Sequence, residues 1–150
     1  MTKLEMSIVI NRPVEEVFEY LSDPENEQQH RPGLLESEIM SEGPYGVGTT
    51  TREVSQFLGL RIETTAIVTE YEPNKKIALK TTSGPIPFQM SATFEPVEDG
   101  TKVTETFEGE VGGFFKLAEP VVIRMGMRQM ETEFKNVKDL LEMEENNDST

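Results

Sequence analysis

Hydrophobic and polar residues alternate at the start of the chain, and this pattern predicts a first strand over residues 3–10. Leu4, Met6, Ile8 and Ile10 share one face of that segment, and a period of two indicates a strand with one buried side. The period changes after Asn11 and Pro13, which are suited to the N-cap and the first turn of a helix. Hydrophobic residues then follow at helical spacing, at Val14, Val17, Phe18 and Leu21. We therefore expect a short amphipathic helix, followed by a second short helix or loop over residues 25–33.

The middle of the chain alternates again and predicts six further strands. They are bounded by turn residues such as Pro73-Asn74, Gly84-Pro85 and Glu98-Asp99-Gly100, which are typical of tight turns and hairpins. Consecutive strands joined by short turns pair antiparallel, because parallel crossovers need a dozen or more residues. The predicted strands cover residues 34–41, 49–57, 60–71, 77–82, 88–95 and 103–107.

The last element predicted is a long helix over residues 115–143. Its hydrophobic residues recur at steps of three or four, which gives one buried stripe: Ile123, Met127, Met130, Phe134, Val137 and Leu141. A one-sided antiparallel sheet must cover its apolar face, and this helix is the element best able to do so. We expect an α+β fold in one domain over residues 1–144, followed by an acidic, disordered tail over residues 145–150.

The composition narrows the possible partners. The 150 residues include 28 acidic and 14 basic side chains, for a net charge of −14. Such a charge repels nucleic acids and anionic membrane surfaces. Cysteine is absent, so disulfides and thiolate chemistry are excluded. No signal peptide is visible, and no apolar run approaches the roughly 20 residues of a membrane span. These features favour a cytoplasmic protein without stable membrane insertion.

Four segments resemble the START-like (SRPBCC) superfamily, and in particular its polyketide cyclase/dehydrase-like branch. They are INRPVEEVFEYLSDPEN (10–26), GPYGVGTTTR (43–52), VTEYEPNKKIALKT (68–81) and ATFEPVEDGTKVT (92–104). The resemblance runs in order over residues 3–143. It implies a helix-grip fold, in which a curved antiparallel sheet of about seven strands wraps around the C-terminal helix and encloses a deep hydrophobic cavity. One departure is His30, which stands where this branch commonly has tryptophan.

The resemblance suggests which apolar side chains line the cavity, although each is also suited to ordinary core packing. Flexible methionine thioethers are well suited to adaptable apolar surfaces. The candidate ligand-binding residues are Phe57, Phe88, Met90, Ala92, Phe107, Phe115, Leu117, Val121 and Met125.

A few polar residues are candidates for chemistry. Glu105 is in register with Val103 and Phe107, so it enters the cavity if those two point inward, where a carboxylate must be paired or neutralised. Arg124 and Arg128 share a helix face and could pair with it or hold a ligand carboxylate; otherwise they form surface ion pairs of little worth. His30, the only histidine, is a weak acid–base candidate that more often would be a solvated surface residue. Tyr45 is a third weak catalytic candidate.

Three functions remain open at this stage. The first is binding or transport of a hydrophobic small molecule or lipid-like ligand, by apolar contacts with a few orienting polar groups. The second is a cyclase- or dehydratase-type enzyme for a polyketide-like or other apolar substrate, with Glu105, His30 or Tyr45 moving protons. The third is a protein-interaction module. We lean towards a non-enzymatic role, and expect neither a metal site, because no cluster has ligand spacing, nor a cofactor.

Overall fold

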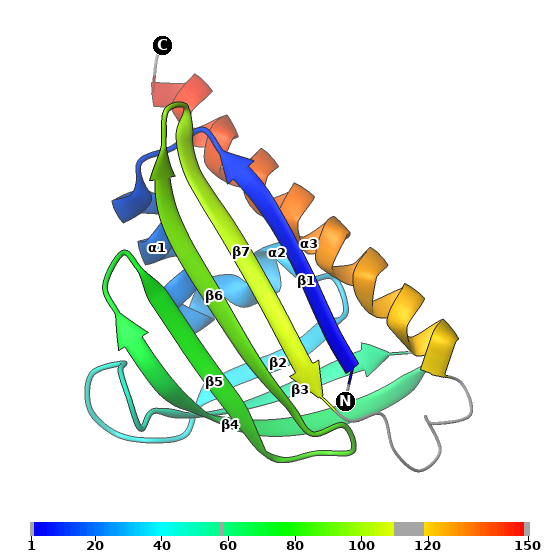
Figure 1. Ribbon diagram of the computed structural model, residues 1–150. Coiled ribbons are helices and arrows are strands. Elements are labelled where there is room, and N and C mark those ends of the chain that lie inside the picture. Colours follow the sequence, from blue (N-terminus) through cyan, green and yellow to red (C-terminus); the bar gives the residue numbers. More distant parts are fainter. Residues whose placement is uncertain (1, 58, 110–118, 149–150) are drawn as a thin grey trace.

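The structure is a computed structural model that describes residues 2–57, 59–109 and 119–148. These residues form seven strands (Figure 1). Short helical segments lie between the first and second strands, and a long helix follows the last strand. The strands are β1 (Thr2–Ile10), β2 (Leu34–Ile39), β3 (Thr50–Phe57), β4 (Leu60–Glu72), β5 (Lys76–Ser83), β6 (Phe88–Val97) and β7 (Gly100–Gly109). The helical segments are α1 (Val14–Ser22), the 3-10 turn η1 (Pro24–Asn26), α2 (Glu27–His30) and α3 (Glu119–Asp148).

The seven strands form one antiparallel sheet in the order β1-β7-β6-β5-β4-β3-β2. The connection through α1, η1 and α2 carries the chain from one edge strand, β1, to the other, β2. Figure 1 shows the sheet curling so that α2 and α3 lie on its concave side, with α3 running beside β1. The predicted α+β helix-grip arrangement, with two short helices after the first strand, is confirmed.

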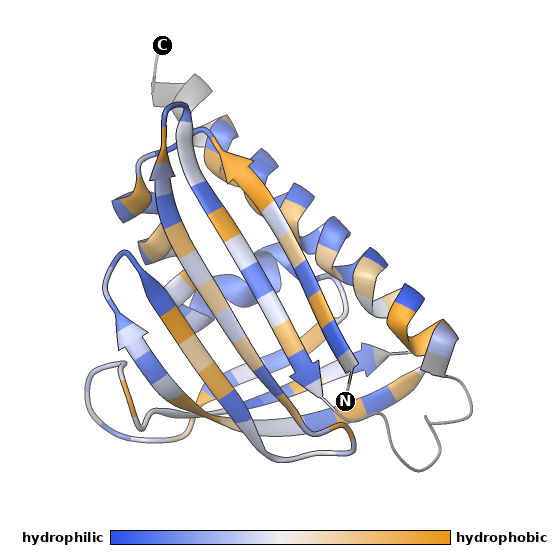
Figure 2. Ribbon diagram, viewed as in Figure 1, coloured by the Kyte–Doolittle hydropathy of each residue, from blue (hydrophilic) through white to orange (hydrophobic). Residues whose placement is uncertain are grey.

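The core lies where the concave face of the sheet meets α1 and the C-terminal half of α3. Hydrophobic and hydrophilic residues alternate along the strands, as the alternating colours of Figure 2 show for much of β1 and β7, and residues two apart share one face. Phe18 of α1 contacts Phe94 of β6 edge-on, with ring centroids 5.0 Å apart. The buried cluster consists of Ile10, Val17, Phe18, Ile77, Ala92, Phe94, Val103, Phe134, Val137 and Leu141.

Two helix boundaries differ from the sequence prediction. Asn11 does not cap α1: Pro13 occupies the N-cap, and the Asn11 amide donates to Glu142 Oε1 at 3.3 Å. Proline restricts the backbone at the entry into the helix, so the N-cap lies two residues after the position expected for it. Helix α3 continues to Asp148, into the segment expected to be a disordered tail, because glutamate is a good helix former. Among the described residues, no helix is long and apolar enough to cross a membrane.

Candidate ligand cavity

A cavity of about 280 Å³ lies between the concave sheet, α2 and the middle of α3. One part of its wall is apolar and comes mainly from the sheet: Leu4, Ile77, Leu79, Phe88, Met90, Ala92, Phe94 and Phe107. The other part is polar and comes from the helices and from β3, the loop before it and β7: Glu27, His30, Arg31, Tyr45, Thr51, Glu53, Glu105, Gln129 and Glu133. The cavity therefore has two different walls, one of apolar side chains and one that contains a cluster of ionisable groups.

The apolar wall follows from strand register. Ala92 on β6 lies opposite Glu105 on β7, and Met90 lies opposite Phe107. Because side chains two residues apart share a face, the inward row of each strand continues along the cavity. Phe88 and Phe107 meet with ring centroids 5.6 Å apart. The predicted lining residues Phe88, Met90, Ala92 and Phe107 all lie in this wall.

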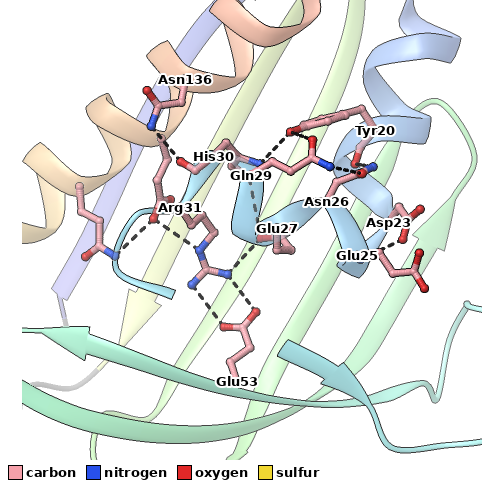
Figure 3. A network of polar contacts seen from close by, with 12 residues as sticks. Tyr20, Asp23, Glu25, Asn26, Glu27, Gln29, His30, Arg31, Glu53 and Asn136 are labelled. Carbon is pink, nitrogen blue, oxygen red and sulfur yellow. Dashed lines mark hydrogen bonds and ion pairs between the residues drawn. The ribbon is translucent and has the colours of Figure 1, made fainter. Parts of the chain in front are cut away.

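The polar wall is organised around Arg31 (Figure 3). Its Nη1 donates to Glu53 Oε1 at 2.9 Å and to Glu27 Oε2 at 3.0 Å, while Nη2 donates to Glu53 Oε2 at 3.3 Å. On the other side, its Nε lies 3.4 Å from Glu133 Oε1. One guanidinium thus joins α2, β3 and α3 through three carboxylates, and bidentate pairs of this kind are geometrically specific.

Burial raises the pKa of two of these carboxyl groups, Glu27 and Glu133. Burial raises the pKa of Glu27 to about 7, against the lowering effect of Arg31 and with a further increase from Glu53. Burial also raises the pKa of Glu133, and Arg31 again opposes the shift. For Arg31, burial works against the charged form, but the nearby carboxylates of Glu53, Glu27 and Glu133 raise its pKa. Arg31 is therefore a permanent cation, while Glu27 gains and loses its proton near neutral pH.

Glu105 lies in the cavity wall without the partners that the other acids have. No hydrogen bond or ion pair reaches its carboxyl group from the described residues, and its nearest neighbours in register are Ala92 and Met6. Burial raises the pKa of Glu105 to about 8, with added repulsion from Glu133 and Glu27 and a small opposing effect of Arg31. Its side chain is half-buried by accessible area because it borders the cavity itself, so the enclosed environment decides its protonation.

His30 is buried, contrary to the expectation of a solvated loop residue: its side chain is 5% exposed. It lies on α2, with Nδ1 3.4 Å from the Tyr20 hydroxyl, and the Asn136 amide donates to its backbone carbonyl at 3.1 Å. Burial, followed by the charge of Arg31, lowers the pKa of His30 to about 4. The imidazole is therefore neutral at neutral pH, and Glu27 Oε2, 3.8 Å from Nε2, does not face a histidine cation.

Tyr45, from the loop before β3, completes the polar wall. Its ring packs edge-on against Tyr71, with centroids 5.7 Å apart. Burial raises the pKa of its hydroxyl to about 12, with a further increase from the charge of Glu27. Tyr45 keeps its proton and can act as a hydrogen-bond donor.

The arginines proposed on the last helix do not reach the cavity. Arg124 and Arg128 are not among the residues that line it, and Val121 and Met125 are 50% and 37% exposed. An α-helix turns about 100° per residue, which turns these positions away from the stripe that contains Met130. The cavity is instead lined by Gly126, Gln129, Met130, Glu133, Phe134 and Val137. The side chain of Phe57, and all of Phe115 and Leu117, lie outside the described residues.

The sequence analysis missed Glu27, Arg31, Glu53 and Glu133. Glu27 and Arg31 had a weak signal, since they are four residues apart in a segment that could be helical. Among the described residues, no group of three or more His, Cys, Asp or Glu side chains is arranged to hold a metal ion.

Residues 1–142 match the model of a family described as polyketide cyclase / dehydrase and lipid transport. No curated protein sequence gives a significant match. Similar solved structures include TTHA0849 from Thermus thermophilus, at 18% identity and a TM-score of 0.81 over 92% of this chain and 95% of that chain. A START superfamily protein from Mycobacterium smegmatis has 15% identity and a TM-score of 0.77 over 94% and 97%. The Zhui aromatase/cyclase from Streptomyces sp. R1128 has 16% identity and a TM-score of 0.77 over 94% and 93%. At identities this low, the high TM-scores establish a shared fold and nothing more specific.

Proposed function

This chain belongs to the polyketide cyclase/dehydrase and lipid-transport family, and on that premise we propose that it binds a small amphiphilic molecule in the cavity. The observation that supports this most directly is the two-sided wall, in which aromatic and aliphatic side chains of β5, β6 and β7 face a cluster of ionisable groups. Ligand sites are typically mostly apolar, with a few polar groups that fix orientation. The apolar wall would hold the body of the ligand and the polar wall its head.

The size of the cavity limits the size of the ligand. A volume of about 280 Å³ lies near the lower end of the roughly 300–1,000 Å³ typical of ligand pockets. A molecule of about ten non-hydrogen atoms is favoured over a whole phospholipid. Burying its apolar surface contributes about 25 cal/mol per Å² before the costs of association.

Glu105 supports a second candidate, an acid–base enzyme. A carboxyl group with a pKa near 8 is protonated at neutral pH and could donate a proton to a substrate in the cavity. The similar chain from Streptomyces sp. R1128 is described as an aromatase/cyclase. We rank this function second, because neutral His30 is directed towards Tyr20 and every other acid of the cluster contacts Arg31.

Binding can be tested by calorimetric titration with octanol, a neutral probe of suitable size. We expect saturable binding at one site. Ala92→Phe, in the cavity wall opposite Glu105, should weaken binding at least about tenfold, a loss of roughly 1.4 kcal/mol. Ala78→Phe is the matched control, since Ala78 lies on the neighbouring strand outside the cavity lining. Absence of octanol binding, or equal binding by both variants, would contradict the proposal.

Turnover distinguishes the two candidate functions. Small molecules that co-purify with the protein can be extracted and their masses determined, then determined again after prolonged incubation with excess protein. A carrier leaves those masses unchanged. A loss of water or another defined mass change, abolished by Glu105→Gln, would instead favour the enzyme.

A further inference from the structure

The polar wall of the cavity contains more acidic groups than basic ones. Four carboxyl groups, those of Glu27, Glu53, Glu105 and Glu133, line it together with the guanidinium of Arg31, which pairs with all of them except Glu105. The remaining titratable groups do not restore balance. His30 is neutral because its pKa is lowered to about 4, and Tyr45 keeps its proton because its pKa is raised to about 12.

Arg31 has little left to offer an anionic ligand. All three of its nitrogens already contact carboxylates: Nη1 and Nη2 both donate to Glu53, Nη1 also donates to Glu27, and Nε lies 3.4 Å from Glu133. A ligand carboxylate would have to displace one of these acids and leave it buried without a partner, which costs several kcal/mol. Arg124 and Arg128, the other cations considered for this role, lie outside the cavity lining.

Glu105 is the group in this wall that still needs a partner. Its carboxyl borders the cavity, and no hydrogen bond or ion pair reaches it from the described residues. A carboxyl group in an enclosed site becomes charged only where an opposite charge or a hydrogen bond compensates for the loss of water. Glu105 and the small Ala92 opposite it in register both line the cavity, so a partner can come from the cavity.

We propose that the ligand presents a protonated amine to the polar wall, with Glu105 as its main ionic contact. This inference rests on the proposed binding function and specifies the chemical class of the ligand. The ammonium group would pair with the unpartnered Glu105 carboxylate, while Glu27 and Glu133 add attraction at longer range. An alcohol satisfies the same hydrogen bond without the charge, and an acid meets repulsion from every side except Arg31.

Proton release is a second consequence. Free Glu105 holds a proton at neutral pH because burial and Glu133 raise its pKa to about 8. An ammonium group at the carboxyl favours its charged form, because an opposite charge lowers a carboxyl pKa. Binding of the amine should therefore release up to about one proton near pH 7, whereas binding of the matching alcohol should release almost none.

The test compares octylammonium, octanol and octanoate, which share one apolar body and differ in head-group charge. In titrations of the complete protein at neutral pH and moderate salt, octylammonium should bind at least about tenfold more tightly than octanoate, with octanol between them. Titrations in phosphate and in MOPS, whose ionisation enthalpies differ and neither of which is a net cation, measure the proton released with the amine.

Glu105→Gln removes the charge but preserves the shape of the side chain. In this variant the dissociation constants of octylammonium and octanol should differ by less than about threefold. The proton release on octylammonium binding should fall, and the affinity for octanol should stay unchanged. Glu108→Gln is the matched control, because it removes the same charge from the opposite face of β7. It should retain the preference of the native protein.

The outcomes separate this inference from the function on which it rests. If none of the three probes binds, the proposed function itself fails. If octanol binds but octylammonium is no tighter, or octanoate is tightest, the amine inference fails and the binding function stands. A preference for octylammonium that survives in Glu105→Gln and disappears with added salt is surface attraction to a chain of charge −14, and it also overturns the inference.

Discussion

Helix α3 and strand β7 both pass from a closed core into a hollow one. At one end Leu141 of α3 and Val103 of β7 belong to the same buried cluster, and their side chains are 3% and 0% exposed. Two to three turns earlier along the helix, Glu133 and Gln129 face the cavity, as does Glu105 two residues further along the strand. The same pair of elements therefore builds two interiors of opposite character.

The packed end is held by contacts that leave little freedom. Thr101 is fully buried and its hydroxyl donates to the Arg12 carbonyl at 2.9 Å. The β6–β7 turn needs Gly100, at φ 148°, since a Cβ there would lie 2.1 Å from the Ile10 carbonyl oxygen. We infer that this end supplies most of the stability, which allows the cavity end to keep buried acids that cost stability.

Truncating one phenylalanine in each region should give the largest difference. Phe18→Ala removes a ring that packs on Phe94 and Tyr71, and we expect it to lower the free energy of unfolding by about 4 kcal/mol. Phe107→Ala should cost about half as much, because its ring faces the cavity on one side and has fewer atoms to lose contact with. Denaturant unfolding measures both changes. An equal or larger cost for Phe107→Ala would mean that the cavity end is as well packed as the other.

Removing the central cation of the polar wall should have the next largest effect. Arg31→Met leaves Glu27, Glu53 and Glu133 without their shared partner. We expect it to lower the free energy of unfolding by about 3 kcal/mol near pH 8. The loss should shrink in acid, where the carboxyl groups are protonated. Thermal and denaturant unfolding at both pH values check this.

Arg52→Met is the matched control for that prediction. Arg52 also contacts three glutamates, Glu36, Glu38 and Glu63, but in a more open surface cluster on the same sheet. Solvent screens such pairs, so Arg52→Met should lower the free energy of unfolding clearly less than Arg31→Met does. Equal losses for the two arginines would show that the cavity cluster behaves like a surface network.

The sequence predicted the apolar wall better than the polar one, for a physical reason. Strand alternation is local and groups Phe88 with Met90 on one face of their strand, and the family resemblance then assigned them, together with Phe107, to the cavity. The same alternation placed Glu105 beside them. The long helix was predicted in type and approximate extent, but its lining was not, because several phases of a hydrophobic stripe are consistent with Val121 and Met125.

The residues around Arg31 depend on tertiary contacts that have no local pattern. Glu53 and Glu133 are two of 28 acids, and their proximity results from α2 docking between β3 and α3. His30 was expected in solvent because its neighbours are polar, yet those polar neighbours are the cavity wall. Buried charge of this kind contradicts residue-level expectations, and such contradictions tend to occur at functional sites.

The pH dependence of stability gives the smallest but most specific effect. Glu105 has a pKa of about 8 in the folded protein, above its ordinary value of about 4.5, so the folded state holds a proton that the unfolded state releases. Stability therefore falls as pH rises between these values. His30 acts oppositely: its pKa is lowered to about 4, so stability is lost as pH falls below about 6.5. Above that pH only the carboxyl groups contribute.

Glu105→Gln should remove most of that alkaline loss. Glutamine cannot ionise, so the stability of the variant relative to the native protein should rise by about 2 kcal/mol between about pH 6.5 and about pH 9. A shallower slope from Glu27, whose pKa is about 7, should remain. Glu108→Gln, on the outer face of the same strand, should follow the native curve. Parallel curves of stability against pH for the native protein and Glu105→Gln from about pH 6.5 to about pH 9 would show that Glu105 is already ionised in the empty cavity. The contrast between a packed end and a cavity end whose buried carboxyl groups retain protons would then be wrong.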